Sequence, residues 1–309
     1  MIRQPIIAGI DGSQESVRAA SLAWRLARAM DAQCVLVHAV PNVWAPGGMA
    51  PLVNSGEVFD LVVSDLQKWL SRELGAEIPD AVRRSLVARP GRPDIVLDQV
   101  AREYEAGLIV VGARHHGALA RGFGGSTAHR LVRTSPVPVL VAQGPGQVPR
   151  RILVATELSP AAAPTLSTAW RYADLLTAQL RVVHVFEPAK FRPVVPLSLD
   201  EHAFESSSRR KFDRLIALEL PRVAPSDRIV RRGKADEEIG EEAVAWQADL
   251  VVVGTHGTNW VDRMLIGSTT ERLLNRLPAS LLVVPVNRRA ARASGLSGRR
   301  KSRKEMVML

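Results

Sequence analysis

The residues best suited to chemistry lie in two glycine-rich segments, each of which follows a short apolar run. Gly125-Ser126-Thr127 begins thirteen residues after Gly112, and Gly267-Ser268-Thr269 begins thirteen residues after Gly254. Glycine lets the backbone come close to a ligand, and free amides at the start of a helix attract anions. The adjacent hydroxyl groups add hydrogen-bond donors. Each segment is therefore typical of a phosphate-binding site.

The second motif glycine differs between the two segments. Gly257 stands three residues after Gly254, whereas His115 stands three residues after Gly112. Histidine adopts a positive φ only at a cost, and its ring could either fill a phosphate channel or donate a hydrogen bond to phosphate. A shifted loop could instead let Gly117 take the place of the glycine. The first segment is the less regular of the two.

An acidic residue follows the first apolar run of each copy, where a parallel strand would end. It is Asp11 in the first copy and Glu157 in the second. In open parallel sheets, ligands collect beyond the carboxyl ends of the strands, where the winding direction changes. Glutamate carries its carboxylate about 1.5 Å further from the backbone than aspartate does, which is enough to disturb a hydrogen bond. Both acids are candidate ligand contacts.

Four other polar residues in these regions stand at positions that predict structural roles. Ser13 and Ser159 stand where helices are expected to begin, which favours them as helix caps. His38 and His184 occupy equivalent positions in apolar runs. A polar ring in such a run is expected to be buried and hydrogen-bonded rather than catalytic.

The sequence offers no clear catalytic group. It contains neither a Gly-x4-Gly-Lys-Ser/Thr phosphate loop nor a Gly-x-Ser-x-Gly nucleophile turn. The adjacent His115 and His116 lack the Cys, Asp or Glu spacing of a metal site, so neither a catalytic residue nor a metal ligand is assigned. Arg114, Arg121 and Arg263 lie within or beside the glycine segments and could meet phosphates. Binding is therefore expected rather than rapid turnover.

The residues around these segments predict alternating strands and helices. In the first copy, strands are expected at 5–10, 34–40, 85–88, 108–111 and 137–142, with helices at 15–30, 58–74, 93–105 and 126–133. In the second copy, strands are expected at 152–155, 180–186, near 229, 250–253 and 281–284, with helices at 161–176, 204–220, 236–246 and after Gly267. Near-continuous apolar strands between helices favour a parallel sheet covered on both faces.

The predicted fold class is therefore α/β and Rossmann-like, with two tandem doubly wound domains that each contain a five-stranded parallel sheet. A chain of 309 residues is long enough for about two domains. The internal repeat indicates two copies of one folding unit. The predicted domains span residues 1–142 and 150–286, joined by a linker at 143–149 and followed by a basic tail at 287–309.

Composition narrows the cellular setting. The sequence has no run of eighteen uncharged apolar residues, and its start lacks the apolar core of a signal peptide. A cytoplasmic protein without a membrane span is therefore expected. The single cysteine, Cys34, lies in an apolar run, which favours a buried, inert thiol over a disulfide or a redox site.

The positive charge is concentrated at one end of the chain. The formal net charge is +10, and residues 286–309 hold eight Lys or Arg and one Glu, a net of +7 that leaves +3 for the rest. The composition of this tail is typical of disorder. Basic segments can bind nucleic acid by counterion release, but no aromatic residues are interleaved here to stack on bases. A solvated tail is favoured over a nucleic-acid partner.

Together these motifs resemble the universal stress protein family. The resemblance covers residues 3–142 and 150–286, and it lies in the pattern Gly-x2-Gly-x9-Gly-Ser/Thr after the fourth strand and an acidic residue after the first. Nucleotide-binding members of that family use these residues for ATP. The resemblance therefore implies a tandem member with an adenine nucleotide, ATP with or without Mg²⁺, as its ligand.

The resemblance also implies which residues would line each nucleotide site. The acid would contact the adenosine, and the main chain of the residue just after His38 or His184 would meet the adenine. The first glycine would border the ribose and phosphate path, and the Gly-Ser-Thr segment would hold phosphates. In the first copy these are Asp11, Ala39, Gly112, His115, Gly125, Ser126 and Thr127. In the second copy they are Glu157, Val185, Gly254, Gly257, Gly267, Ser268 and Thr269.

Two functional hypotheses follow. The first is a regulatory stress-response protein whose two domains pair as an internal pseudo-dimer and bind ATP with slow or no hydrolysis. The resemblance also implies self-association through the last strand of each domain, and it leaves open whether the two fused copies satisfy that edge internally or a homodimer forms. The second is an ATP-independent dimerisation or interaction scaffold with one or both pockets degenerate. His115 and Glu157 favour the scaffold, whereas the retained Gly-Ser-Thr segments disfavour it. Zero, one or two bound nucleotides all remain compatible with the sequence.

Overall fold

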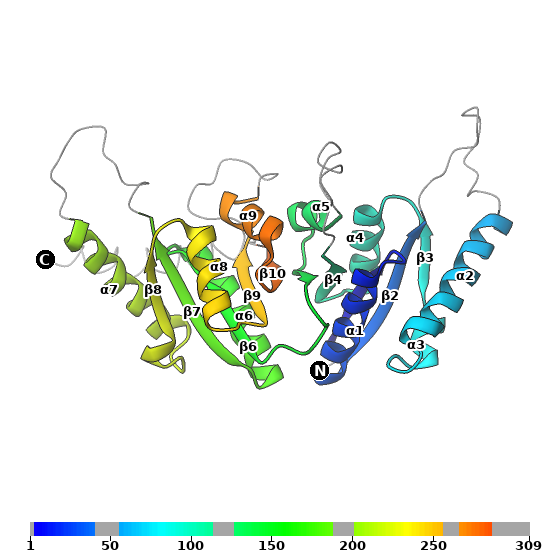
Figure 1. Ribbon diagram of the computed structural model, residues 1–309, viewed down its shortest axis with the longest axis horizontal. Helices are drawn as coiled ribbons and strands as arrows, with labels where there is room; N and C mark the ends of the chain where they lie inside the picture. Colours follow the sequence, from blue (N-terminus) through cyan, green and yellow to red (C-terminus); the bar gives the residue numbers. More distant parts are fainter. Residues whose placement is uncertain (1–2, 41–55, 114–126, 188–200, 256–265, 286–309) are drawn as a thin grey trace, which may run out of the picture. The chain divides into compact units, whose positions relative to one another are not determined.

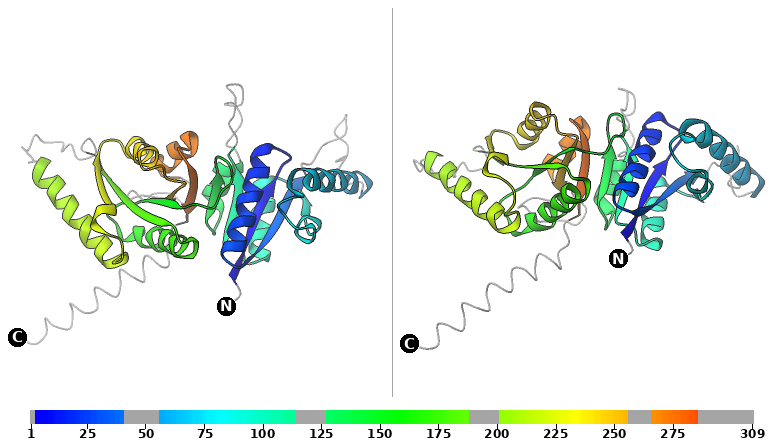
Figure 2. Two further views of the ribbon diagram at one scale, coloured as in Figure 1. Left: turned by 60° about the horizontal axis from the view of Figure 1, so that its bottom comes forward. Right: turned by 90° about the horizontal axis from the view of Figure 1, so that it is seen from below.

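Two compact units divide the chain, the first built mainly from residues 1–149 and the second mainly from residues 150–278. The computed structural model describes residues 3–40, 56–113, 127–187, 201–255 and 266–285. Strands alternate with helices in both units, and helices cover both faces of each set of strands (Figure 1 and Figure 2). The prediction of an α/β fold with two tandem doubly wound domains is confirmed.

The first unit holds its strands in the order β3-β2-β1-β4-β5, and neighbouring strands are parallel. Its elements in chain order are β1 (Arg3–Ile10), α1 (Gln14–Ala29), β2 (Ala32–Val40), α2 (Gly56–Leu74), α3 (Asp80–Arg84), β3 (Val87–Pro90), α4 (Pro93–Glu103), β4 (Leu108–Gly112), α5 (Thr127–Thr134) and β5 (Val139–Ala142). The crossover through α1 leads from β1 to β2, whereas the crossover through α4 leads from β3 to β4, in the opposite direction along the sheet. Right-handed crossovers therefore place these two helices on opposite faces of the sheet.

The second unit repeats this arrangement in the order β8-β7-β6-β9-β10. Strand β6 pairs in parallel with β7 and β9, and β7 pairs in parallel with β8. Its elements in chain order are β6 (Arg151–Ala155), the 3₁₀ turn η3 (Pro160–Ala162), α6 (Ala163–Leu176), β7 (Gln179–Phe186), α7 (Glu201–Glu219), the 3₁₀ turn η5 (Pro225–Asp227), β8 (Arg228–Arg232), α8 (Ala235–Ala245), β9 (Leu250–Gly254), α9 (Ser268–Arg276) and β10 (Ser280–Val284).

The region before β4 departs from the sequence expectation. Helix α3 is too short to show a helical period, and it is held by the buried Arg83, which pairs with Asp80 and donates to the Ile78 carbonyl at 3.0 Å. The strand expected at 85–88 is displaced to β3 because the Ser85 amide still closes α3 on the Ala81 carbonyl at 3.2 Å. Pro90 is tolerated because β3 is an edge strand.

The core of each unit lies on its central strands. Ile7 and Ile109 in the first unit, and Val154 and Val252 in the second, are fully buried. Helices cover both faces of these strands, which explains their continuous apolar sequences. Within the described ranges, no helix is long and apolar enough to cross a membrane. The candidate site lies at the carboxyl ends of these strands.

Candidate functional site

The carboxyl ends of β6 and β9 form the switch point of the second unit. Strand β6 has β7 on one side and β9 on the other, so the chain winds away from β6 in two directions (Figure 1). Ligands of open parallel sheets bind in the crevice at such a point. Glu157 follows the end of β6, and Gly254 is the last residue of β9. The structure therefore brings these two predicted residues to neighbouring strand ends.

The start of α9 is tied to the same strand end. The Gly267 amide donates to the Thr255 carbonyl at 2.9 Å, and Thr270 Oγ1 donates to the Gly254 carbonyl at 2.9 Å. The Thr255 amide in turn donates to the Val284 carbonyl at 3.0 Å. These bonds hold the first turn of α9 beside the end of β9, although Gly257 itself lies outside the described residues.

The first turn of α9 presents backbone amides. Gly267 is the N-cap, with extended backbone angles of φ −58° and ψ 139°, and no side chain caps the helix. The first intrahelical bond runs from the Glu271 amide to the Gly267 carbonyl at 3.0 Å, so Ser268 and Thr269 have no acceptor within the helix. The Ser268 side chain is exposed and that of Thr269 is half-buried. Such a turn can bind an anion through its amides and hydroxyls.

The equivalent site of the first unit is described only in part. Asp11 follows β1, Gly112 ends β4, and Thr127 begins α5. His115, Gly125 and Ser126 lie outside the described residues, as do the loop residues Arg114, His116, Gly117 and Arg121. Arg263, beside the glycine segment of the second unit, also lies outside them.

Gly112 has a packing role that its sequence position did not reveal. A Cβ at this position would lie 2.6 Å from the backbone carbonyl carbon and oxygen of Glu15, in the first turn of α1. Only glycine therefore allows the start of α1 to come this close to the end of β4. The resemblance assigns Gly112 to the ribose and phosphate path, and the contact with Glu15 provides a second reason for a glycine there.

In each unit, the acid accepts a hydrogen bond from the serine two residues further along the chain. Asp11 Oδ1 accepts hydrogen bonds from the Ser13 amide at 3.0 Å and from Ser13 Oγ at 2.5 Å. Glu157 Oε1 accepts one from Ser159 Oγ at 2.6 Å. The longer glutamate thus still reaches its serine. Both carboxylates are kept beside the ends of their strands.

The same serines cap the helices that follow, as the sequence predicted. Ser13 Oγ accepts the Ser16 amide at 3.2 Å at the start of α1. Ser159 Oγ accepts the Ala161 amide at 3.2 Å, but this amide belongs to the 3₁₀ turn η3, which leads into α6. Each acid is therefore connected through its serine to the first turn of the next helix.

The two histidines are hydrogen-bonded through Nδ1 to the backbone of the neighbouring strand or its end. His38 Nδ1 lies 2.7 Å from the Ile10 carbonyl, and His184 Nδ1 lies 3.0 Å from the Thr156 carbonyl. His184 is buried, and its Nε2 lies 3.1 Å from Ser208 Oγ on α7. Burial lowers the pKa of His184, although the backbone hydrogen bond opposes this effect. The structural role predicted for His184 is confirmed.

The residues after these histidines are the ones assigned to the adenine by resemblance. Ala39 is buried near the end of β2, and Val185 is half-buried near the end of β7. Each strand neighbours the one that ends before the acid. The geometry therefore places Glu157 between Val185 on one side and Gly254 on the other.

The sequence analysis did not identify a buried carboxylate that helps to position α9. Asp236, in the first turn of α8, has an exposed fraction of only 1%. Its Oδ1 pairs with Arg272 at 3.1 Å, and its Oδ2 lies 3.5 Å from Arg276; both arginines belong to α9. Asp94 and Arg130 make the equivalent, longer pair at 3.8 Å in the first unit. The repeated spacing of these Asp and Arg residues was the available signal.

Cys34 is buried and free, as predicted. Burial raises the pKa of its thiol to about 12, so little thiolate forms at neutral pH. Among the residues that the structure describes, no group of three or more His, Cys, Asp or Glu side chains is placed to hold a metal ion.

Comparison with known proteins identifies the family of this chain. The model of the Universal stress protein family matches the chain twice, over residues 3–143 and 149–285. A universal stress protein of Mycolicibacterium smegmatis is 28% identical over 294 residues, which cover 90% of this chain and 96% of that protein. One from Mycobacterium tuberculosis is 27% identical over 291 residues, with the same two coverages.

A solved structure supports the fold. The crystal structure of a universal stress protein from Archaeoglobus fulgidus has a TM-score of 0.61 and 18% sequence identity, and the match covers 92% of this chain and 98% of that one. The two family matches together span nearly all of the chain before the basic tail. The chain therefore belongs to the universal stress protein family, with two copies of the family domain in tandem.

Proposed function

We propose that this chain is a cytoplasmic regulatory protein of the stress response that binds ATP and releases it without rapid hydrolysis. The observation that carries the proposal is the start of α9. Its uncapped first turn stands at the switch point of the second unit, tied to the end of β9 through Gly267 and Thr270. A helix start at a switch point is a common phosphate site in α/β proteins.

The proposed binding mode assigns one part of the nucleotide to each strand end. The amides and hydroxyls of Ser268 and Thr269 would hold phosphates, because the first turn of α9 leaves its amides free of intrahelical bonds. Glu157 would contact the adenosine, and the main chain of Val185 would meet the adenine. Gly254 and Gly257 would let the backbone pass close to the ribose and phosphates.

Binding rather than turnover is proposed because the residues assigned to the site supply mainly hydrogen-bond donors. Phosphoryl transfer also needs a group that orients the attacking water and charges that neutralise the leaving group. Glu157, the carboxylate at this strand end, already accepts the Ser159 hydroxyl. Mg²⁺ could accompany the phosphates, but no residue is assigned to hold it.

Calorimetric titration of the full chain with ATP and ADP tests this proposal. We expect heat on adding ATP, and at 100 times the dissociation constant a stabilisation of about 2.7 kcal/mol. Gly267→Val should remove binding at the second unit, because the side chain would occupy the phosphate path. Its backbone angles, φ −58° and ψ 139°, are open to valine, so the variant should fold.

Gly125→Val is the matched variant for the first unit. Any heat that remains in Gly267→Val and disappears in the double variant would belong to that first site. If the native chain carries no nucleotide, releases no heat and shows no thermal shift with ATP, the binding proposal fails. The scaffold alternative would then account for the two domains.

The proposal keeps the two domains at residues 1–142 and 150–286 as separate binding units. It includes their pairing within the chain and further association as a homodimer, both of which are expected from the family resemblance. Light scattering of the full chain would report the number of chains in the particle. A mass equal to one chain at all concentrations would refute the homodimer.

A further inference from the structure

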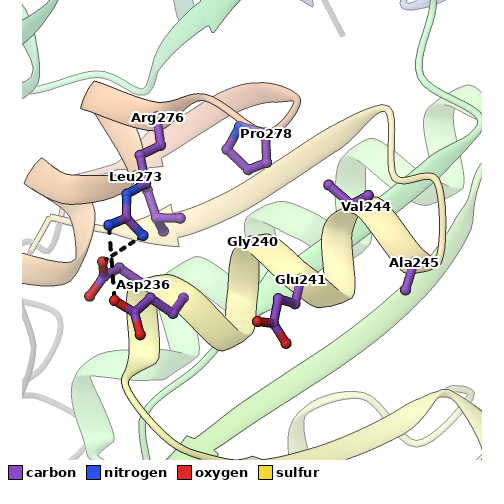
Figure 3. Close-up of a pocket in the computed structure, with 9 residues that line it drawn as sticks. Asp236, Gly240, Glu241, Val244, Ala245, Leu273, Arg276 and Pro278 are labelled. Atoms are coloured by element: carbon purple, nitrogen blue, oxygen red, sulfur yellow. Dashed lines mark ion pairs between the residues drawn. The ribbon is translucent and has the colours of Figure 1, made fainter.

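A groove of about 460 Å³ lies between α8 and α9 in the second unit (Figure 3). Its apolar part is formed by small and aliphatic residues: Gly240, Val244, Ala245, Leu273 and Pro278. Val244 has an exposed fraction of 66%, which is unusual for a valine beside other apolar groups. The groove is separate from the proposed nucleotide site, because it lies along the helices and not at the strand ends.

Charged residues border one end and one side of the groove. Arg276 reaches across from α9 to Asp236 and Glu237, at 3.5 and 3.9 Å, and borders the end beside the start of α8 (Figure 3). Glu241 lies on the open side, and its side chain has an exposed fraction of 69%. Helix α8 as a whole carries five acidic residues and no Lys or Arg. Lys or Arg residues of the second unit pair with all five acids, but the side chains of Glu237 and Glu241 stay 47% and 69% exposed. The groove is therefore apolar, with two exposed acids at its border.

In the first unit, an ion pair occupies the equivalent face of α4. Asp98 and Arg102 on α4 stand 142 residues before Gly240 and Val244, the same offset that relates Asp94 to Asp236. Arg102 Nε lies 2.9 Å from Asp98 Oδ2. The second unit has lost both charged groups and exposes a valine instead. Nothing in the α/β fold requires this difference, since the two helices are otherwise equivalent.

We propose that residues 299–309 of the same chain dock in this groove. This segment places five Lys or Arg (Arg299, Arg300, Lys301, Arg303 and Lys304) next to four consecutive apolar residues, Met306-Val307-Met308-Leu309. The apolar residues match the groove between Val244, Leu273 and Pro278, and the basic ones match the exposed carboxylates of Glu237 and Glu241 at its border. Methionine adapts well to shallow apolar surfaces.

The length of chain makes this docking possible. Met306 follows Pro285 by 21 residues, which span up to about 70 Å when extended. A domain of this size has a radius of gyration of about 14 Å, so the segment can reach any face of the second unit. A tethered segment is also present at a high effective concentration, so weak contacts are sufficient.

Disulfide formation in the full chain tests the proposal. With oxidised glutathione as the oxidant, Val244→Cys/Met308→Cys should form an intramolecular disulfide at least about tenfold faster than Leu218→Cys/Met308→Cys. Leu218 on α7 is the control, because its side chain is 76% exposed and it belongs to the same unit as Val244. The native Cys34 is buried, with a pKa raised to about 12, and should not compete. Adding Glu241→Lys should slow the reaction of the first pair.

Equal rates for the two cysteine pairs would overturn the proposal. A disulfide that forms only between two chains would also overturn it, because the groove would then receive a second copy. Hydrogen exchange gives an independent measurement. Met306→Asp/Met308→Asp should raise exchange in α8 and α9 but not in α4 and α5, and unchanged exchange in α8 and α9 would contradict docking.

A groove variant completes the test. Gly240→Asp/Val244→Arg installs the ion pair of the first unit, and a side chain at Gly240 would meet no atom within 4 Å. The variant should therefore fold and raise exchange along α9 as much as the tail variant does. A variant that folds and keeps the native exchange pattern would refute the groove as the docking site.

Discussion

The two units share one topology but fill equivalent positions with opposite chemistry. Val35 on β2 and Val100 on α4 are buried in the first unit. The equivalent residues of the second unit are Arg181 on β7 and Glu242 on α8, which pair at 2.9 Å. Arg231 on β8 pairs with the same carboxylate at 2.7 Å. A pair of valines in one unit thus corresponds to a charged pair in the other.

This difference shows which parts of the fold tolerate change. Replacing an apolar contact by a buried ion pair requires both partners to change, because a single buried charge is strongly unfavourable. Arg181 also lies over the Trp246 ring, with its guanidinium carbon 4.5 Å from the ring centre. Cation–π contact and two ion pairs together compensate for the burial. Both units keep one ion pair that helps to position the next helix. Asp236 pairs with Arg272 on α9 in the second unit, and Asp94 pairs with Arg130 on α5 in the first.

The largest expected effect comes from breaking this charged pair. Glu242→Val installs the residue of the first unit and leaves Arg181 and Arg231 without their shared carboxylate, whose side chain is only 7% exposed. We expect the free energy of unfolding to fall by about 3 kcal/mol, the lower end for a broken buried pair, because Arg181 keeps Asp227 and Arg231 keeps Glu238 as a second partner at 3.4 Å. Urea unfolding would measure it. Arg181→Val/Glu242→Val should recover part of the loss, and a loss below about 1 kcal/mol in the single variant would mark the pair as a solvated surface bridge.

A smaller loss of folding stability is expected on substituting Gly112. Gly112→Ala would bring Cβ within 2.6 Å of the Glu15 carbonyl, so α1 must shift away from β4. Overpacking of this kind costs about 1–3 kcal/mol. The control is Gly240→Ala, where no atom lies within 4 Å and the better helix propensity should add about 0.5–1 kcal/mol. Thermal unfolding should therefore move in opposite directions for the two variants, and a neutral Gly112→Ala would disprove the close approach.

The stability of the second unit should depend on pH through the buried His184. Burial lowers the pKa of His184, so below about pH 6.5 the unfolded chain binds a proton that the folded chain does not. Stability should therefore fall as the pH falls below that value, by at most about 1.4 kcal/mol per pH unit. His184→Asn should flatten this part of a urea-unfolding profile. A profile unchanged by His184→Asn would assign the slope to other groups.

The smallest expected effect is a change in ATP affinity on exchanging the acids Asp11 and Glu157. Glu157→Asp gives the second unit the acid of the first, and we expect ATP affinity there to rise by about fivefold, or ~1 kcal/mol. The reciprocal variant Asp11→Glu should weaken binding at the first unit by a similar factor. Calorimetry with Gly125→Val and Gly267→Val backgrounds separates the two sites. A lower affinity in Glu157→Asp would show that the bond between Glu157 and Ser159, at 2.6 Å, already sets the useful carboxylate position.

Much of the fold could be predicted because its signals are local. The apolar runs of β1, β4, β6 and β9 and the helical spacing of α1 appear directly in the sequence, and the repeat shows them twice. Helix α3 could not be predicted, because five residues show no period and its support is a long-range burial of Arg83. The displacement of β3 follows from the same cause.

The places of the predicted site residues in the fold could be predicted, whereas their contacts could not. Asp11, Glu157, Gly254, Gly267 and Ser268 lie at strand ends or at the start of α9, as the spacing indicated. The packing of Gly112 on Glu15 and the link from each acid to its serine depend on distances between elements. Spacing alone cannot show such contacts.

The sequence by itself determined the duplicated α/β fold, the family and the positions of the two Gly-Ser-Thr segments, because periodicity and spacing are properties of the chain. Only the tertiary structure decided which charges are buried and which apolar groups are exposed. The neutralisation of Glu242 by Arg181 and Arg231 comes from three separate elements. The exposure of Val244 depends on what packs beside α8, so the groove between α8 and α9 could not be found from the sequence of either helix.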